Sequence, residues 1–235
     1  MQTVKLDPRL SSVAALVRQG SRVADIGTDH AYLPVFLLQT GVSPSAVAAD
    51  LRKMPLENAK KTVETYSLEG KITTVLSDGL DSIDPESCDD IVIAGMGGLL
   101  ITGLISRTLW LKDSRFRLVL QPMSHAEDLR RFLFENGFEI VEECCSQDGR
   151  HSYCAMAAEY KGEAFAFSPA LPYIGKLTEN RDEITAIYLK KQLLRLEKRC
   201  TALKNAAADN SVEVERLSEI IEDFKRLTEE KDDNR

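Results

Sequence analysis

Three acidic residues, Asp25, Asp50 and Asp78, stand at or directly after short apolar runs in the first third of the chain. If these runs are strands of a doubly wound sheet, their carboxyl ends border the crevice in which such folds bind ligands. A carboxylate accepts hydrogen bonds from both hydroxyls of a ribose, and Asp50, which lies 25 residues after Asp25, has an offset suited to that role. We expect Asp78 to accept a hydrogen bond from the exocyclic amine of a purine.

The turn after Asp25 argues against a pyrophosphate-containing cofactor. Asp29 and Ala31 stand where the dinucleotide fingerprint would have further glycines, and a carboxylate there would repel a pyrophosphate. S-adenosylmethionine carries no phosphate, and its sulfonium and amine are positive. The three acids therefore favour S-adenosylmethionine over NAD or FAD. An alternative stays open, in which Asp25 and Asp29 only cap turns.

The order of the expected elements predicts the fold. Seven short apolar runs are expected to be strands, namely 23–27, 46–50, 72–76, 90–94, 118–120, 138–142 and 153–157. Helix-length segments lie between them, namely 32–39, 55–66, 99–108 and 126–136. Strands that alternate with helices predict a parallel sheet covered on both faces. The last two strands, joined by the polar turn 146–151, predict an antiparallel hairpin at one edge. This α/β layout resembles the Rossmann-like class I methyltransferases.

The hydrophobic pattern of the sequence changes after Pro169 and Pro172, and two helices with heptad spacing are expected there. Their apolar positions are Leu189, Leu193, Leu196, Cys200 and Leu203, then Val214, Leu217, Ile221 and Phe224. Ser211 is expected to be the N-cap of the second helix. We therefore predict a methyltransferase domain over 1–165 and an antiparallel, coiled-coil-like helical hairpin over 166–235. The charged tail 229–235 is expected to fray.

Composition limits the class of protein. The 235 residues carry 30 Lys and Arg against 37 Asp and Glu, a net charge of −7, and 43% are hydrophobic. Such a chain can bury a sizeable core, which excludes disorder along its whole length. It has neither an apolar run of the ~20 residues that span a bilayer nor a signal peptide, so we expect a cytoplasmic protein without membrane association. Five cysteines and three histidines lack zinc-site spacing, and no metal is expected.

Five motifs resemble the bacterial tRNA (adenine-N1)-methyltransferases that act at position 22 of the D-arm. They are Asp7–Leu10, Asp25–Pro34, Ser77–Leu80, Ile93–Gly98 and Gln121-Pro122, and the resemblance covers about residues 5 to 160. Met123 follows the last motif, where the family more often has Asn. The resemblance implies a cofactor pocket made of Asp25, Gly27, Thr28, Asp29, His30, Asp50, Leu51, Asp78, Gly79, Ala94, Gly95 and Met96.

The chemistry expected for such an enzyme is simple. Adenine N1 has a lone pair in the neutral base, so attack on a sulfonium methyl needs no prior deprotonation. The protein must expose N1, which we expect it to do by flipping the base, and must align N1 with the methyl. Glycines of the expected loop 94–98 leave room for a flat base. Asp29, His30 and Gly95 are expected to position it, and His30 is either a proton acceptor or a structural group.

Contacts with the tRNA phosphates need cations, since the net charge is negative. Candidates for tRNA contact are Arg9, Tyr32, Lys53, Arg130, Lys190, Lys191 and Arg195. The basic stretch 190–199 is either a tRNA-binding arm or a solvated helix face. Tyr32 either stacks on the flipped base or packs in the core. A monomer is expected. Two other functions stay open, a methyltransferase acting on a small metabolite or protein, and a non-catalytic tRNA-binding protein.

Overall fold

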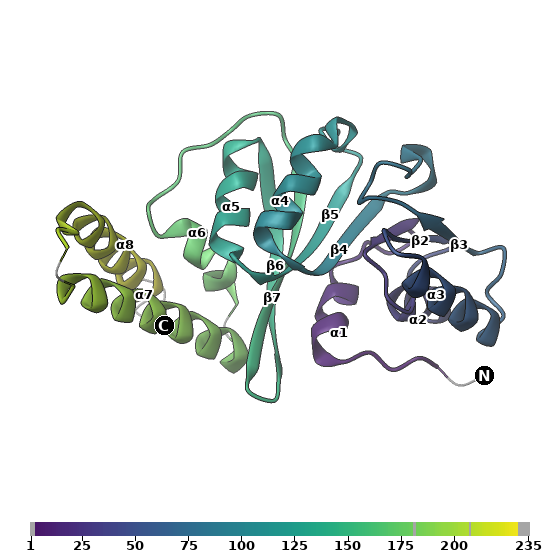
Figure 1. The fold of residues 1–235 in the computed structure, drawn as a ribbon, viewed down its shortest axis with the longest axis horizontal. Coiled ribbons are helices and arrows are strands. Elements are labelled where there is room, and N and C mark those ends of the chain that lie inside the picture. Colours follow the sequence, from purple (N-terminus) through teal and green to yellow (C-terminus); the bar gives the residue numbers. More distant parts are fainter. Residues whose placement is uncertain (1–2, 181, 207, 230–235) are drawn as a thin grey trace.

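A computed structural model, which describes residues 3–180, 182–206 and 208–229, contains a seven-stranded sheet with strand order β3-β2-β1-β4-β5-β7-β6 (Figure 1). The strands are β1 (Val23–Ile26), β2 (Ala46–Asp50), β3 (Ile72–Leu76), β4 (Asp90–Gly97), β5 (Arg117–Ser124), β6 (Phe138–Asp148) and β7 (His151–Tyr160). β1 to β5 are parallel, whereas β7 runs antiparallel to both of its neighbours. The expected mostly parallel sheet with an edge hairpin is confirmed.

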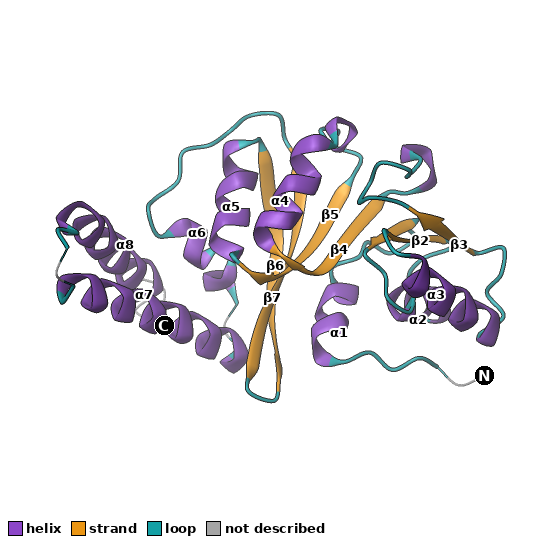
Figure 2. Cartoon of the chain, in the orientation of Figure 1, coloured by secondary structure: helices purple, strands orange, loops and turns teal. Residues whose placement is uncertain are grey.

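Helices cover both faces of the sheet, as Figure 2 shows. Those of the first part of the chain are α1 (Pro8–Ala15), α2 (Tyr32–Gln39), α3 (Lys53–Thr65), α4 (Gly98–Arg107) and α5 (Ala126–Glu135), with single-turn 3-10 helices at Pro85–Ser87 and Leu109–Leu111. Alternate residues of a strand face opposite sides of a sheet. Accordingly Val23 packs in a core with α1, α2 and α3, whereas Ala24 and Ile26 pack in a second core with α4 and α5.

Two expected loops belong to strands. The segment 95–97, predicted to follow the strand as a loop, is the end of β4, which pairs with β5 through irregular register at Met96 and Gly97. The turn predicted over 146–151 is also wrong, because the strands pair as far as Asp148 and His151 and only Gly149 and Arg150 separate them. Polar side chains concealed this longer hairpin, since backbone pairing continues where neither face is apolar.

The C-terminal part contains α6 (Leu171–Ile174), a 3-10 helix at Leu177–Glu179, and the long helices α7 (Glu183–Lys204) and α8 (Ser211–Glu229). The last two pack against each other beside the sheet (Figure 1). The expected heptad positions line their seam, to which Ile220 and residues of α6 also contribute. Ser211 is not the N-cap, because α8 begins at Ser211 itself and the Asp209 carboxylate accepts from its N–H. The tail expected to fray lies, beyond Glu229, outside the described residues.

Among the described helices, none combines the length and apolarity that a membrane crossing requires.

Candidate active site at the carboxyl ends of the strands

The strand order brings three of the predicted carboxylates to one edge of the sheet. β3, β2 and β1 are neighbours and parallel, so Asp78, Asp50 and Asp25 follow one another along their carboxyl ends. The chain reverses its direction of travel between β1 and β4, which is the switch point at which doubly wound sheets bind ligands. The sequence-predicted row of acids therefore lies where the fold offers a site.

Asp25 is the most perturbed group of this row. Its side chain is buried, and burial raises the pKa of Asp25 to about 6. A hydrogen bond from Thr28 and the positive charge of Arg9 oppose this rise, whereas the charge of Asp50 adds to it. A buried carboxylate with too few compensating partners favours the arrival of a cation.

The turn between β1 and α2 is held tightly to the end of β2. The N–H groups of Gly27 and Thr28 both donate to Ala49 O, at 2.8 and 2.9 Å, and Thr28 Oγ1 accepts from the Ala31 N–H at 3.1 Å. Gly27 has φ +81°, and a Cβ on it would overlap the Met96 methyl. The positive φ therefore favours glycine here, whereas the flexible Met96 side chain could shift to admit a Cβ.

Asp50 is buried and partly committed to its own loop. Its Oδ1 accepts from the Arg52 N–H at 2.7 Å, and Arg52 Nε lies 3.5 Å away. Two large apolar side chains near it are exposed, Leu51 at 63% and Leu76 at 49%, and Leu76 pairs with Asp50 in register. Exposed apolar surface beside a carboxylate suits a ligand that has both a flat ring and hydroxyl groups.

Asp78 differs from the other two acids because it is exposed and already paired. Arg107 Nη2 donates to Asp78 Oδ1 at 2.7 Å and to Asp78 O at 2.8 Å. Gly79 has φ +59°, a conformation that favours glycine, and a Cβ on it would overlap the Leu104 side chain of α4. Nothing in the sequence pattern indicates this partner, because Arg107 follows Asp78 by 29 residues.

A buried glutamine joins Gly95 to the N-terminal segment. Gln121 Oε1 accepts from Arg9 Nη1 at 2.9 Å and from the Gly95 N–H at 3.1 Å, while its Nε2 donates to Pro122 O at 2.9 Å. Gly95 has φ +78° within β4. The sequence motif Gln121-Pro122 does not indicate that this side chain holds both Arg9 and Gly95.

Asp29, His30 and Tyr32 lie together after the β1 turn. His30 Nε2 is 3.5 Å from Asp29 Oδ2, and the His30 and Tyr32 rings stack with centroids 5.2 Å apart. Tyr32 is 45% exposed, so it is not packed in the core. An exposed, pre-stacked ring pair offers a surface for a further ring.

Apart from Arg9 and Tyr32, which are described above, the predicted tRNA contacts divide into an exposed group and one buried residue. Lys53, at the start of α3, and Lys190, Lys191 and Arg195 of α7 are exposed. Arg130 cannot be a phosphate contact, because it is 1% exposed, lies 2.7 Å from Glu143 in an ion pair and donates to Pro172 O. Its prediction is wrong because a basic pair on a helix does not show which member faces inward.

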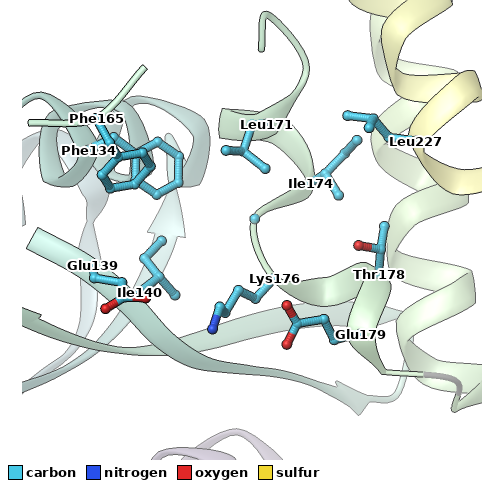
Figure 3. A pocket seen from close by; sticks show the side chains of 11 residues that line it. Phe134, Glu139, Ile140, Phe165, Leu171, Ile174, Lys176, Thr178, Glu179 and Leu227 are labelled. Carbon is cyan, nitrogen blue, oxygen red and sulfur yellow. The ribbon is translucent and has the colours of Figure 1, made fainter. Parts of the chain in front are cut away.

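Two cavities flank the sheet on its β5-β7-β6 side. One, of about 350 Å³, lies between α5, the start of β6 and the α6 segment, with Phe134 and Phe165 near one end and Lys176 and Glu179 near the other (Figure 3). This is the amino-terminal edge of the sheet, far from the acids. The other, of about 290 Å³, borders the carboxyl end of β5, the start of β7 and α7. Over residues 3–180, 182–206 and 208–229 no cluster of three metal-ligating side chains occurs.

Comparisons with known proteins agree with this geometry. A model of the methyltransferase domain family matches residues 6–156. The chain is 30% identical to the tRNA (adenine(22)-N(1))-methyltransferase of Bacillus subtilis (strain 168), over 97% of this chain and 98% of that one. A Streptococcus pneumoniae structure in complex with S-adenosyl-L-methionine matches at 31% identity and TM-score 0.79, over 95% of this chain and all of that one. M. capricolum TrmK in complex with S-adenosyl-homocysteine matches at 25% identity and TM-score 0.78, over 95% and 98%.

Proposed function

The chain belongs to the methyltransferase domain family and, within it, to the tRNA (adenine(22)-N(1))-methyltransferases, and from this membership we propose that it transfers a methyl group from S-adenosylmethionine to N1 of adenine 22 in tRNA. The observation that carries the proposal is the row of carboxylates at the ends of β1, β2 and β3, joined to similarity over nearly the whole chain.

The residues present fit S-adenosylmethionine. Asp25 is a buried carboxylate, and the positive amine of the cofactor would stabilise its ionised form. Asp29 stands where a pyrophosphate would need backbone N–H groups free of a negative side chain. Asp50 is oriented by the Arg52 N–H, which leaves carboxylate lone pairs for ribose hydroxyls. Leu51 and Leu76 offer apolar surface to the two faces of an adenine. When bound, the cofactor supplies an electrophilic methyl group.

Further residues of the pocket follow from their positions. Thr28 and His30 close it at the β1 turn, and Ala94 and Met96 line the end of β4. Asp78 reaches the adenine amine only if its ion pair with Arg107 opens or is shared. Gly79 contributes through the packing of its loop on α4.

The reacting base is held beside β4. Gln121 fixes the Gly95 N–H, so the backbone carbonyls near Gly95 are pre-oriented toward the base. Asp29 accepts from the adenine amine, whose acidity rises as N1 is alkylated, and Tyr32 stacks on the flipped ring from its position on His30. Such alignment of two bound reactants supplies up to ~7–11 kcal/mol of the barrier reduction.

The D-arm contacts two surfaces of the protein. Arg9, Tyr32 and Lys53 border the pocket, whereas Lys190, Lys191 and Arg195 lie on α7. Cations on both sides of the target suit recognition of folded RNA through its phosphates and shape. A tRNA substrate supports a cytoplasmic location for the enzyme. The α7–α8 seam is filled within one chain, which supports a monomer.

Methyl transfer to a defined tRNA tests this function. The assay uses radiolabelled S-adenosylmethionine, an unmodified tRNA transcript and the same transcript with adenine 22 replaced by guanine. Label is expected in the first transcript as 1-methyladenine and is expected to be absent from the second. Equal labelling of both transcripts would contradict the assigned position, and no labelling of either would contradict the function.

A further inference from the structure

We propose that the cavity of about 290 Å³ at the carboxyl end of β5 binds a nucleotide that flanks the target adenine, an inference that rests on the proposed function. We call it the flanking groove. Its lining comes from the β5–α5 turn, the start of β7 and one face of α7, with the following residues used in the argument: Met123, His125, His151, Tyr153, Gln192 and Arg195.

The flanking groove lies at the end of the strand next to the proposed reaction site. β5 neighbours β4, and Pro122 and Ser124 pair with Met96 and Gly97 in register. Adjacent strands lie about 4.8 Å apart. A Cβ on Gly98 would overlap the His125 carbonyl, so the start of α4 packs directly against the groove wall. An RNA strand whose base lies beside Gly95 therefore has its next nucleotide within reach of this groove.

The groove offers flat rings for a base. His151 and Tyr153 are two apart on β7 and share a face, with ring centroids 6.4 Å apart and an interplanar angle of 29°. His125 lines the groove from the start of α5, where its Nδ1 lies 2.9 Å from Asp128 Oδ2. Proteins recognise unstacked RNA bases by stacking them on aromatic and histidine rings.

Polar groups on α7 complete the site for a nucleotide rather than for a free anion. Arg195 Nη2 is 2.8 Å from Glu127 Oε1, which leaves other guanidinium donors unused by that pair. Lys191 Nζ donates to Ser152 Oγ at 2.8 Å at the rim. Glu127 offsets part of the charge of Arg195, which disfavours a phosphate held by Arg195 alone, whereas a nucleotide adds base contacts beside Gln192 to a phosphate contact with the remaining Arg195 donors.

The C-terminal hairpin thereby becomes a wall of the substrate site. Tyr188, on the same helix as Gln192 and Arg195, is buried and its OH donates to Cys154 Sγ at 3.2 Å. This contact fixes α7 against β7, so the width of the groove is set by the packed core and not by a mobile arm.

Tests use the full chain and tRNA affinity measured by fluorescence anisotropy. The variants are His151→Ala and Gln192→Ala, and Gln19→Ala is the matched control, an exposed glutamine that precedes β1 at the amino-terminal end of that strand, away from the groove. Each protein is titrated with unmodified tRNA and with two tRNAs that carry an abasic residue on the 5′ or the 3′ side of adenine 22. We expect His151→Ala to weaken binding of unmodified tRNA about 5- to 100-fold, since base stacking contributes on that order. Gln192→Ala is expected to weaken it less and Gln19→Ala to leave it unchanged.

The abasic tRNAs separate a lost base contact from a general defect. Wild type is expected to bind one of the abasic tRNAs as weakly as His151→Ala binds unmodified tRNA. On that abasic tRNA, His151→Ala is expected to bind no more weakly than wild type. Wild-type affinity of His151→Ala, or a loss that persists on both abasic tRNAs, overturns the flanking groove. If the protein binds tRNA and the effect of His151→Ala disappears on one abasic tRNA, but no methyl is transferred, the proposed function alone is overturned. If methyl transfer is normal but the effect of His151→Ala is the same on every tRNA, the flanking groove alone is overturned. A wild type that does not bind tRNA would overturn both.

Discussion

Asp25 shows how a single functional residue destabilises the fold that carries it. Burial raises its pKa from the ordinary 3.8 to about 6, so the folded state binds this proton more tightly than the unfolded chain. Above pH 6 the ionised form therefore costs about 3 kcal/mol of stability, and this cost declines as the pH falls toward 4. Functional sites commonly retain such costs because the ligand relieves them.

Replacement of this carboxyl is expected to stabilise the free protein. Asp25→Asn should raise the free energy of unfolding by up to about 3 kcal/mol at pH 7.5 and by about half as much at pH 5. Urea unfolding followed by circular dichroism measures both values. Asp89→Asn is the control, and its effect on stability is expected to have the opposite sign. Hydrogen bonds from Arg22 lower the pKa of Asp89 to about 2, so loss of this carboxylate is expected to destabilise the protein at pH 7.5. If the free energies of unfolding of Asp25→Asn and wild type differ by the same amount at both pH values, the raised pKa of Asp25 is contradicted.

At the same scale, the sequence predicted the types of residue in the site better than their partners. Asp25 and Asp50 are found at the expected strand ends because strand period and a following glycine or helix start are local signals. The pairing of Asp78 with Arg107, and of Gln121 with both Arg9 and Gly95, joins distant parts of the chain. Such contacts depend on how the elements pack, which one sequence does not specify.

At the scale of elements, the buried pair Arg130–Glu143 fastens the C-terminal segment to the sheet. Glu143 also accepts from the Lys176 N–H at 2.8 Å, and Arg130 Nη1 donates to Pro172 O at 2.9 Å. The sequence alone does not show that Glu143 is buried, because a register irregularity between Ile140 and Glu142 changes which side chains of β6 face inward. Strict alternation from Phe138 would have placed Glu143 on the opposite face.

Loss of one member of this pair is expected to be costly. Arg130→Met should lower the free energy of unfolding by ~3–5 kcal/mol, because it leaves an unpaired buried carboxylate. The double variant Arg130→Met/Glu143→Gln should recover part of that loss, since Gln still accepts from the Lys176 N–H. Urea unfolding measures all three proteins. If Arg130→Met is as stable as wild type but binds tRNA more weakly, the structural role of Arg130 is contradicted and Arg130 contacts tRNA phosphates instead.

Strands and helices were predictable where their apolar periodicity is strong, and less so where it is weak. The seam of α7 and α8 follows the predicted heptads. β4 extends through Gly97 although glycines disfavour strands, because pairing with β5 supplies hydrogen bonds that local propensity does not reveal.

For the whole molecule, the sheet and the C-terminal helices share a core. Leu177 and Tyr188 are buried in the cluster that contains residues of β1, β4 and α4, so hydrophobic packing crosses residue 165, the predicted domain boundary. A net charge of −7 means that attraction to tRNA must come from local groups, and we propose that the basic residues of α7 beside the flanking groove provide it. A shared hydrophobic core thus connects the elements that carry the proposed cofactor acids and the proposed RNA contacts.

Calorimetric titration of the cofactor tests most directly the claim that these carboxylates recognise a phosphate-free, positively charged nucleoside. Wild type is expected to bind one S-adenosylmethionine per chain and no NAD. Asp50→Asn, which keeps the bond to the Arg52 N–H, should bind S-adenosylmethionine roughly 10- to 100-fold more weakly, because hydrogen bonds to charged groups contribute about 1.5–3 kcal/mol. Tight binding of NAD, or unchanged affinity of Asp50→Asn for S-adenosylmethionine, would contradict the account.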